Sequence, residues 1–177
     1  MRPQAQATLK VVAAIAVAVV ALAIVGRRVG GLRQTGEEGA AVWFYDLSEK
    51  RLYTVSRETV PPDAGIGGPK GDGVRAVVVA FRGEQGDPGK RRIAYLETCT
   101  PALKGLLERV RQARATGKVM ASGIPPRDSD YVQTNSLVKG PDEAEWHSSN
   151  SLEGRRVMGE WRSWRGPDGQ PPIVCVP

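Results

Sequence analysis

A continuous apolar segment near the N-terminus constrains this chain more than any other feature. Every residue from Val11 to Val25 is Val, Ala, Ile or Leu, and basic residues stand on both sides of this run. As an α-helix, the stretch from Leu9 to Gly26 would rise about 27 Å, close to a hydrocarbon thickness of roughly 30 Å. We therefore predict an uncleaved single-pass membrane anchor within residues 1–26.

A cleavable signal peptide is the alternative interpretation of the same segment. Arg2 and Lys10 would form its basic region, and Ala-Leu-Ala ending at Ala23 has the small-residue pattern of a cleavage site. Ile24 and Val25, however, continue the apolar run past that site, and no polar stretch precedes it. These features favour the uncleaved anchor, and a signal peptide cleaved after Ala23 remains the alternative.

Membrane orientation is not set by charge, because basic residues flank both ends of the apolar segment. A short N-terminal tail before such a segment is typical of a signal-anchor. We therefore expect a single-pass protein of the cell inner membrane whose C-terminal domain lies on the extracytoplasmic, periplasmic side. If the segment is cleaved, we expect a secreted protein.

Composition divides the remaining chain into two parts. Residues 27–40 are rich in glycine and charged residues, which predicts a flexible tether. Residues 41–177 form one small domain with 20 basic and 17 acidic side chains, an excess too small to indicate a nucleic-acid partner.

Two cysteines and a single histidine exclude a disulfide-dense scaffold and a zinc site with several imidazoles. We expect no cofactor.

The domain is expected to have an α+β fold, in which a small antiparallel sheet of about four or five strands packs against two helices, with long Gly/Pro loops. Its strongest strand is 74–82, whose apolar run predicts a central position covered on both faces. Further strands are expected over 92–98 as its partner, over 42–45 and 51–55 as a hairpin, and over 131–138 and 173–176.

The two helices are expected over 100–117 and 151–164. Thr100 followed by Pro101 is typical of an N-cap and first helical position. Apolar residues then recur at helical spacing and predict one buried face. They are Leu103, Leu106, Leu107, Val110 and Ala113.

The only imidazole belongs to His147, which stands in a polar stretch with Glu143 and Glu145. On an extended segment these three side chains would share one face and offer ligands to a metal ion. The same histidine could act as a base for Ser148 or Ser149 in a hydrolase. A hydroxyl directly beside the base is poorly placed, so we favour a solvated loop and keep these residues only as weak catalytic and metal candidates.

The expected C-terminal helix mixes arginine with tryptophan. Such a mixture can bind an anionic polymer or another partner through charge and stacking. Val157, Trp161 and Trp164, however, recur at the spacing of a buried helical face, which favours core packing. The candidate surface consists of Arg155, Arg156, Trp161, Arg162, Trp164 and Arg165.

Two cysteines, Cys99 and Cys175, are candidates for a disulfide. They would pair in an oxidising compartment if the fold brings their strands together. Two buried free thiols are the alternative, because sequence spacing does not establish the geometry that a disulfide needs.

A glycine-rich stretch over 65–73 invites comparison with phosphate-binding loops. Such loops follow a strand, open a helix and carry Lys-Ser/Thr after the last glycine. Here a strand is expected after the stretch instead, and the Lys-Ser/Thr pair is absent. We therefore expect no nucleotide site.

Three motifs run through the domain: Val42-Trp-Phe-Tyr-Asp-Leu with Leu52-Tyr, then Gly73-Val-Arg-Ala-Val-Val-Val, then Tyr95-Leu-Glu-Thr-Cys-Thr-Pro101. Together they resemble an uncharacterised family of small single-pass membrane-anchored bacterial proteins. That family has no known activity, so the resemblance implies an architecture and a compartment only.

The leading prediction for function is a non-catalytic, membrane-anchored envelope module with an interaction or structural role, which presents its loops to a protein partner. Two alternatives stay open. One is a hydrolase or metal-dependent enzyme centred on His147, and the other is an anionic-polymer binder that uses the Arg/Trp-rich helix.

Overall fold

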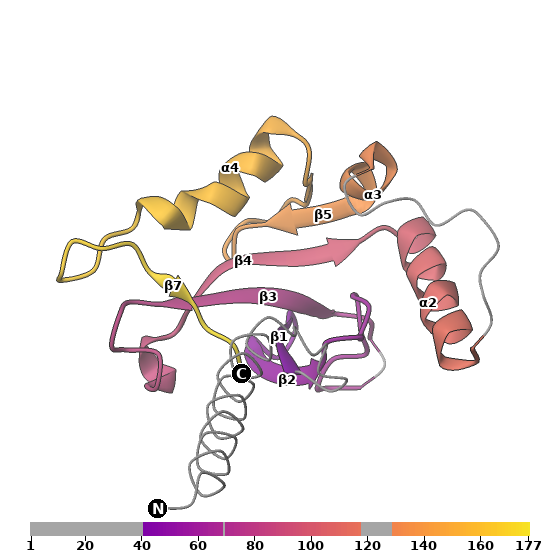
Figure 1. Ribbon diagram of the computed structural model, residues 1–177, viewed down its shortest axis with the longest axis horizontal. Coiled ribbons are helices and arrows are strands. Elements are labelled where there is room, and N and C mark those ends of the chain that lie inside the picture. Colours follow the sequence, from indigo (N-terminus) through magenta and orange to yellow (C-terminus); the bar gives the residue numbers. More distant parts are fainter. Residues whose placement is uncertain (1–40, 69, 118–128) are drawn as a thin grey trace, which may run out of the picture. The chain divides into compact units, whose positions relative to one another are not determined.

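The computed structural model describes residues 41–68, 70–117 and 129–177 (Figure 1). The predicted anchor (1–26) and tether (27–40) lie outside the described residues, so the expectations about them stay predictions. Within the described ranges, no helix combines the length and the apolar character needed to cross a bilayer.

In this described part, one antiparallel sheet of seven strands forms the centre of the domain. Its strands are β1 (Ala41–Asp46), β2 (Arg51–Ser56), β3 (Gly73–Ala80), β4 (Arg92–Cys99), β5 (Ser136–Lys139), β6 (His147–Ser148) and β7 (Ile173–Val174). The order is β2-β1-β3-β4-β5-β6, and β7 also pairs with β3. The antiparallel sheet is confirmed. The expected number of about four or five strands is too low. The two-residue strand β6, for example, lies in a polar stretch and leaves no alternating pattern in the sequence.

The central strand is β3. One of its edges pairs with β1 and, farther along, with β7, while the other edge pairs with β4. Val74, Val78 and Val79 are no more than 2% exposed, which confirms the predicted central, covered position. The predicted hairpin of β1 and β2 and the predicted pairing of β3 with β4 are also confirmed.

The main apolar core surrounds β3 and β4. Its buried members are Val74, Ala76, Val78, Ala80, Leu96 and Cys175, and the half-buried side chains against them are Trp43, Tyr45, Leu47, Leu52, Ile93 and Trp146. The N-terminal hairpin and the β5–β6 connection therefore rest on the same core. Truncation of a fully buried member such as Leu96 to alanine should cost about 2–5 kcal/mol.

The first helix, α2 (Pro101–Ala115), begins as predicted. The Thr100 hydroxyl accepts a hydrogen bond from the Leu103 N–H, and Pro101 occupies the first turn. Leu103 and Val110 are buried, but Leu107 is exposed. The buried face is therefore narrower than the apolar spacing suggested.

The segment 131–138 differs from the prediction of a single strand. It contains the short helix α3 (Asp130–Asn135) and then β5. The Ser129 hydroxyl caps this helix by accepting a hydrogen bond from the Val132 N–H, and Asp130 supplies the acidic first turn that suits a helix N-terminus. Local capping thus outweighs the weak strand pattern in the first half of the segment.

The C-terminal helix, α4 (Leu152–Glu160), is shorter than predicted and continues as the 3₁₀ turn η2 (Trp161–Ser163). It lies beside β4 and β5, while α2 lies toward the opposite end of the sheet (Figure 1). Gly154 permits the close approach, because a Cβ at this position would collide with the backbone oxygen of Ser148 in β6. A second 3₁₀ turn, η1 (Pro88–Lys90), lies in the β3–β4 connection.

Candidate functional site

The metal candidates Glu143, Glu145 and His147 are not gathered around one point. His147 belongs to β6, opposite Val138, whereas the Glu143 carboxylate is engaged by a backbone N–H group and an arginine. Across residues 41–68, 70–117 and 129–177, no group of three His, Cys, Asp or Glu side chains is placed to hold a metal ion.

The hydroxyls of Ser148 and Ser149 tie β6 to α3. Ser149 Oγ donates to the backbone oxygen of Gln133 at 2.9 Å. Ser148 Oγ lies 3.0 Å from the backbone oxygen of Thr134 and 2.7 Å from Asn150 Oδ1. These contacts give both hydroxyls a structural role beside His147.

Both cysteines are free and buried, so the candidate disulfide is not formed. The Cys99 thiol donates to the backbone oxygen of Pro61 at 2.9 Å, and burial raises its pKa to about 11. The backbone N–H of Cys175 donates to Val78, which lies opposite Ile93. Cys99 lies six positions after Ile93 in β4, a span of about 20 Å, which is far beyond the reach of a disulfide.

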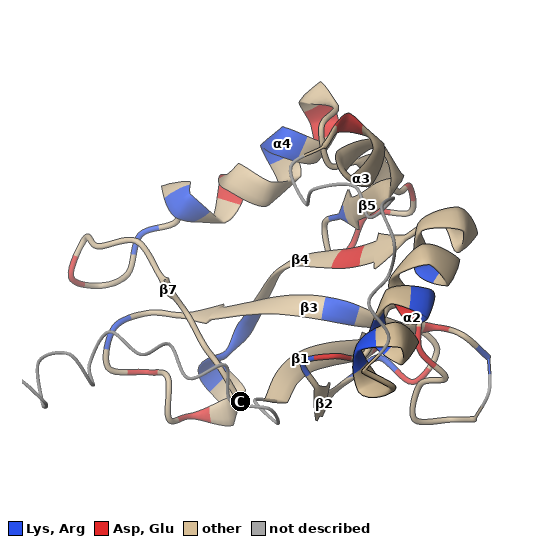
Figure 2. Cartoon of the chain, turned by 45° about the vertical axis from the view of Figure 1, so that its right-hand side comes forward, with Lys and Arg blue, Asp and Glu red and all other residues tan. Residues whose placement is uncertain are grey.

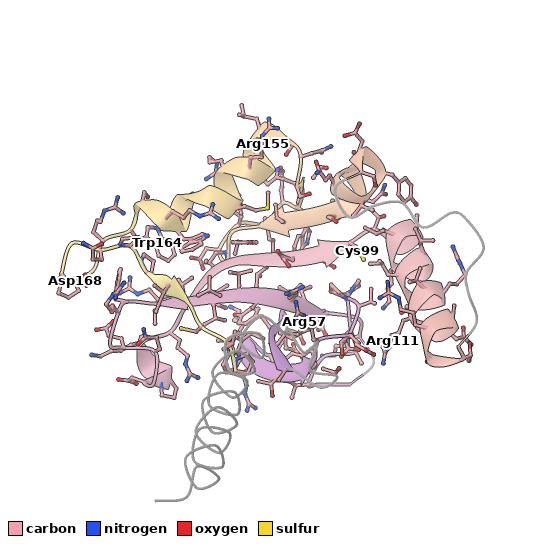
Figure 3. All side chains as sticks on the ribbon, in the orientation of Figure 1. Arg57, Cys99, Arg111, Arg155, Trp164 and Asp168 are labelled. Carbon is pink, nitrogen blue, oxygen red and sulfur yellow. The ribbon has the colours of Figure 1, made fainter. Side chains whose placement is uncertain are left out.

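The arginine and tryptophan residues of the C-terminal segment do not form one open basic face. Acidic and basic residues alternate along α4 (Figure 2). The Arg162 guanidinium lies 5.0 Å from the centre of the Trp161 ring, and Arg165 Nη1 donates to two backbone oxygens of its own segment. Arg155 is exposed and points away from the sheet, whereas Trp164 is half-buried (Figure 3). Val157 is buried, in agreement with the core-packing interpretation.

The structure does bring Arg156 and Trp164 together with residues from the β5–β6 connection. They line a pocket of about 240 Å³. Its lining consists of Ala94, Gly140, Pro141, Asp142, Glu143, Arg156, Val157, Glu160 and Trp164. One wall is formed by the 140–143 turn. The other is formed by α4 and by Trp164, which follows η2, and β4 contributes Ala94 to the lining.

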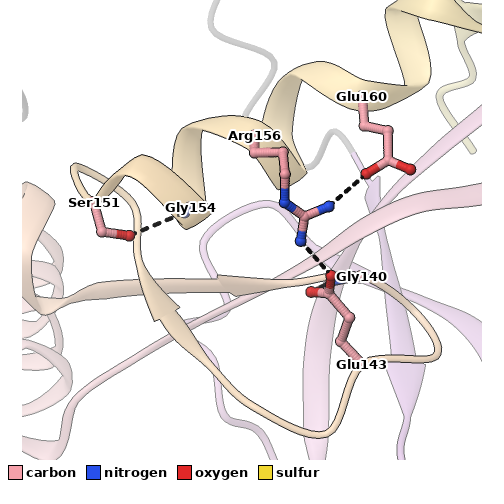
Figure 4. A network of polar contacts seen from close by, with 6 residues as sticks. All are labelled: Gly140, Glu143, Ser151, Gly154, Arg156 and Glu160. Atoms are coloured by element: carbon pink, nitrogen blue, oxygen red, sulfur yellow. Dashed lines mark hydrogen bonds and ion pairs between the residues drawn. The ribbon is translucent and has the colours of Figure 1, made fainter.

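Arg156 bridges the two walls of this pocket. Its Nη2 lies 2.6 Å from Glu143 Oε1, and its Nη1 lies 2.8 Å from Glu160 Oε2 (Figure 4). The other carboxylate oxygen of Glu143 accepts the Gly140 N–H at 2.8 Å. This N–H group and the guanidinium lower the pKa of Glu143, and Glu143 in turn raises the pKa of Arg156.

The bridge shapes the pocket more than it stabilises the fold. The side chains of Arg156, Glu143 and Glu160 are 53%, 33% and 56% exposed. Ion pairs this accessible to solvent contribute about 0–1 kcal/mol each. Lys139 also stabilises the 140–143 turn. Its Nζ donates to the Glu143 backbone oxygen at 3.0 Å and lies 5.1 Å from the Trp146 ring centre. The geometry therefore provides a small, partly open recess with both charged and apolar residues in its lining.

A second polar centre, at Asp46, was not predicted as a site. Asp46 is completely buried at the end of β1, and its carboxylate accepts the N–H groups of Ser48 at 3.0 Å, Glu49 at 2.8 Å and Ile66 at 2.6 Å. The Glu49 N–H contributes most to lowering the pKa of Asp46 to about 2. The Asp-x-Ser-Glu order after a strand is a local turn signal, but the contact with Ile66 has no signature in the sequence.

Asp46 fixes the glycine-rich loop on the sheet. A Cβ on Gly65 would come within 2.5 Å of both Asp46 Oδ2 and Asp72 Oδ1, and the φ angle of Gly65 is +81°. The Tyr53 hydroxyl packs against Gly73 and has no hydrogen-bond partner in the described ranges. Burial and then the nearby aspartates raise the pKa of Tyr53 to about 12. The loop is thus a structural cover for buried polar groups.

Comparisons with known protein families, with curated proteins and with solved structures gave no match for this chain. The resemblance to small membrane-anchored bacterial proteins therefore rests on the three sequence motifs alone.

Proposed function

We propose that this protein is a membrane-anchored, non-catalytic interaction module of the bacterial envelope, whose domain binds a protein partner. The supporting observation is the pocket between the 140–143 turn and α4. Its volume of about 240 Å³ is below the range of about 300–1,000 Å³ that is usual for small-molecule sites. A recess of this size suits one anchoring side chain from a protein surface, the element around which many interfaces are organised.

The position of the pocket also suits a docking surface. Arg156 and Glu160 lie on its rim with more than half of each side chain exposed, so a partner can reach it without opening the fold. Val157 and Ala94 are buried in its lining and belong to α4 and β4, which gives the recess a rigid base. The predicted anchor would hold this surface near other envelope proteins.

The two alternative functions receive less support from the same geometry. The hydroxyls beside His147 are engaged with backbone oxygens, which leaves the proposed hydrolase without a positioned nucleophile at that place. An anionic polymer would meet Asp142, Glu143 and Glu160 beside Arg156, so attraction at this surface is opposed by carboxylates.

Site-specific photo-crosslinking in the native membrane tests the proposal. The crosslinking amino acid p-benzoylphenylalanine replaces Pro141 on the pocket rim in the full-length chain, and the exposed Gly86 of the β3–β4 connection serves as the control position. We expect an adduct of defined mass from position 141 that is absent from position 86. Equal adducts from both positions, or none from 141, would overturn the proposal.

A further inference from the structure

We propose that the pocket accepts a cationic side chain, the guanidinium or ammonium group of an arginine or lysine on the partner. This inference rests on the proposed function, because it names the chemistry of the group that the same pocket would bind. Two independent features of the pocket support it. The first is the excess of negative charge in its lining, and the second is that no cation of the described residues lies over its tryptophan ring.

The lining carries an excess of negative charge. It contains the carboxylates of Asp142, Glu143 and Glu160 and a single cation, Arg156. Arg156 is shared between Glu143 and Glu160, and Asp142 is exposed and forms no ion pair with any residue of the described ranges. Lys139 does not line the recess, because its ammonium group is directed to the Glu143 backbone oxygen and the Trp146 ring. The pocket can therefore take a further positive charge.

The aromatic wall points to the same ligand class. The chain has four tryptophans, and three of them carry a cation over the ring. Arg91 lies 5.2 Å from the centre of Trp43, Lys139 lies 5.1 Å from Trp146, and Arg162 lies 5.0 Å from Trp161. Among the residues that the structure describes, no cation is placed over Trp164, which lines the acidic pocket. A tryptophan beside carboxylates is a favourable place for an arginine or lysine head group.

Replacements of Glu160 and of its partner Arg156 should change the affinity for a cationic probe in opposite directions. Replacement of Glu160 by glutamine removes one attractive charge, whereas replacement of Arg156 by glutamine removes the competing internal cation. The first change should weaken binding of a cationic probe by about threefold, and the second should strengthen it by a similar factor. A purely apolar pocket would respond to neither.

The experiment uses the full-length protein in detergent micelles with ¹⁵N-labelled tryptophan. It is titrated with the blocked tripeptides Gly-Arg-Gly, Gly-Lys-Gly and Gly-Gln-Gly while the indole N–H signals are followed by NMR. We expect the arginine and lysine peptides to shift the Trp164 signal and the glutamine peptide to leave it unchanged. The Trp161 indole, which donates to the Met158 backbone oxygen, is the internal reference. The Asp142→Asn/Glu160→Gln double variant should lose about tenfold in affinity, and Glu153→Gln on the same helix should lose none.

The outcomes separate the two proposals. A Trp164 shift that is equal for all three peptides, or that ignores the Glu160 and Arg156 replacements, would overturn the cationic ligand. If the pocket crosslink at position 141 is nevertheless found, the interaction module stands with a ligand of another chemistry. If the cationic peptides bind as expected but the crosslink is absent, the pocket binds free cationic ligands. The proposed protein-binding function would then be wrong.

Discussion

Asp46, the last residue of β1, and Glu143, which lies after β5, are both carboxylates that accept backbone N–H donors, but they differ in burial and in their partners. Asp46 is completely buried and its charge is met by backbone N–H groups and the Ser48 hydroxyl. Glu143 is one-third exposed, and its main charged partner is the side chain of Arg156, which is itself 53% exposed. The comparison indicates that the first centre maintains the fold, while the second is adjustable and suited to exchange partners with an incoming group.

The largest difference is expected from removal of each carboxylate. Asp46→Ala removes the buried carboxylate that accepts three backbone N–H groups and leaves a void in its place, and we expect the melting temperature to fall by roughly 10 °C or more. Glu143→Ala removes a solvent-exposed ion pair and one turn contact, and the loss should be only a few degrees. Thermal melts followed by circular dichroism measure both. Equal losses would remove the distinction between the two centres.

The glycine-rich loop offers a sharper test of the Asp46 centre. Gly65→Ala places a Cβ against Asp46 and Asp72 in a left-handed backbone conformation, and we expect a loss of about 2 kcal/mol in the free energy of unfolding. Gly86→Ala is the matched control, because an added Cβ there meets no atom within 4 Å. Denaturant unfolding of the two variants should separate them clearly, and a stable Gly65→Ala protein would contradict the description of the loop as a fitted cover.

The two polar centres should also respond differently to pH. The folded-state pKa of Asp46, about 2, lies below its ordinary value of 3.8. Its contribution is therefore complete above pH 4 and is lost as the pH falls toward 2. The melting temperature should decline over this window, and Asp46→Asn should flatten that decline. Glu143→Gln should change the acid slope much less, because Glu143 is partly exposed.

The alkaline side tests Tyr53 in the same loop. Its pKa is raised from 10 to about 12, because burial and the nearby aspartates disfavour the phenolate, so the fold keeps its stability below pH 10 and loses stability as the pH rises toward 12 and Tyr53 ionises in the unfolded chain. Tyr53→Phe should abolish this part of the alkaline loss. At neutral pH the variant should be as stable as the native protein, because the hydroxyl has no partner in the described ranges. A large loss at pH 7 would reveal a hydrogen bond at this hydroxyl.

The smallest expected effect concerns the two thiols, which the structure leaves unpaired. Burial raises the pKa of both Cys99 and Cys175, so little thiolate forms at neutral pH. A thiol reagent should react slowly with the native protein and quickly with two groups after denaturation, with or without reductant. If the unreduced, denatured protein had no reactive thiol, a disulfide would be present, and the separation of Cys99 from Cys175 would be contradicted.

The sequence allowed prediction of the features that are encoded locally. The hairpin of β1 and β2, the apolar β3 and the Thr100-Pro101 start of α2 each have their signal within a few residues. The boundary at Asn135–Ser136, where α3 gives way to β5, was missed because capping by Ser129 competes with a weak strand pattern.

The candidate site could be predicted only in part. The sequence predicts Arg156 and Trp164 as members of one candidate surface and Glu143 separately, as a weak metal candidate. Their meeting depends on the β5–β6 connection folding back onto α4, which brings Glu143 to an arginine 13 residues away. The Asp46 contact with Ile66, over 20 residues, depends in the same way on a long loop closing over the sheet. Such closures are set by tertiary packing and have no periodic signal.

The most direct measurement is pocket-specific crosslinking in the native membrane with paired variants. The crosslinker at position 141 is combined either with Glu160→Gln on the pocket rim or with Glu153→Gln, a matched exposed glutamate on α4 that does not line the pocket. The interaction module with a cationic ligand predicts that the partner adduct decreases with Glu160→Gln, persists with Glu153→Gln, and is accompanied by no change in melting temperature beyond a few degrees. An adduct that is unchanged by Glu160→Gln, or an adduct that is lost equally with both variants, would contradict it.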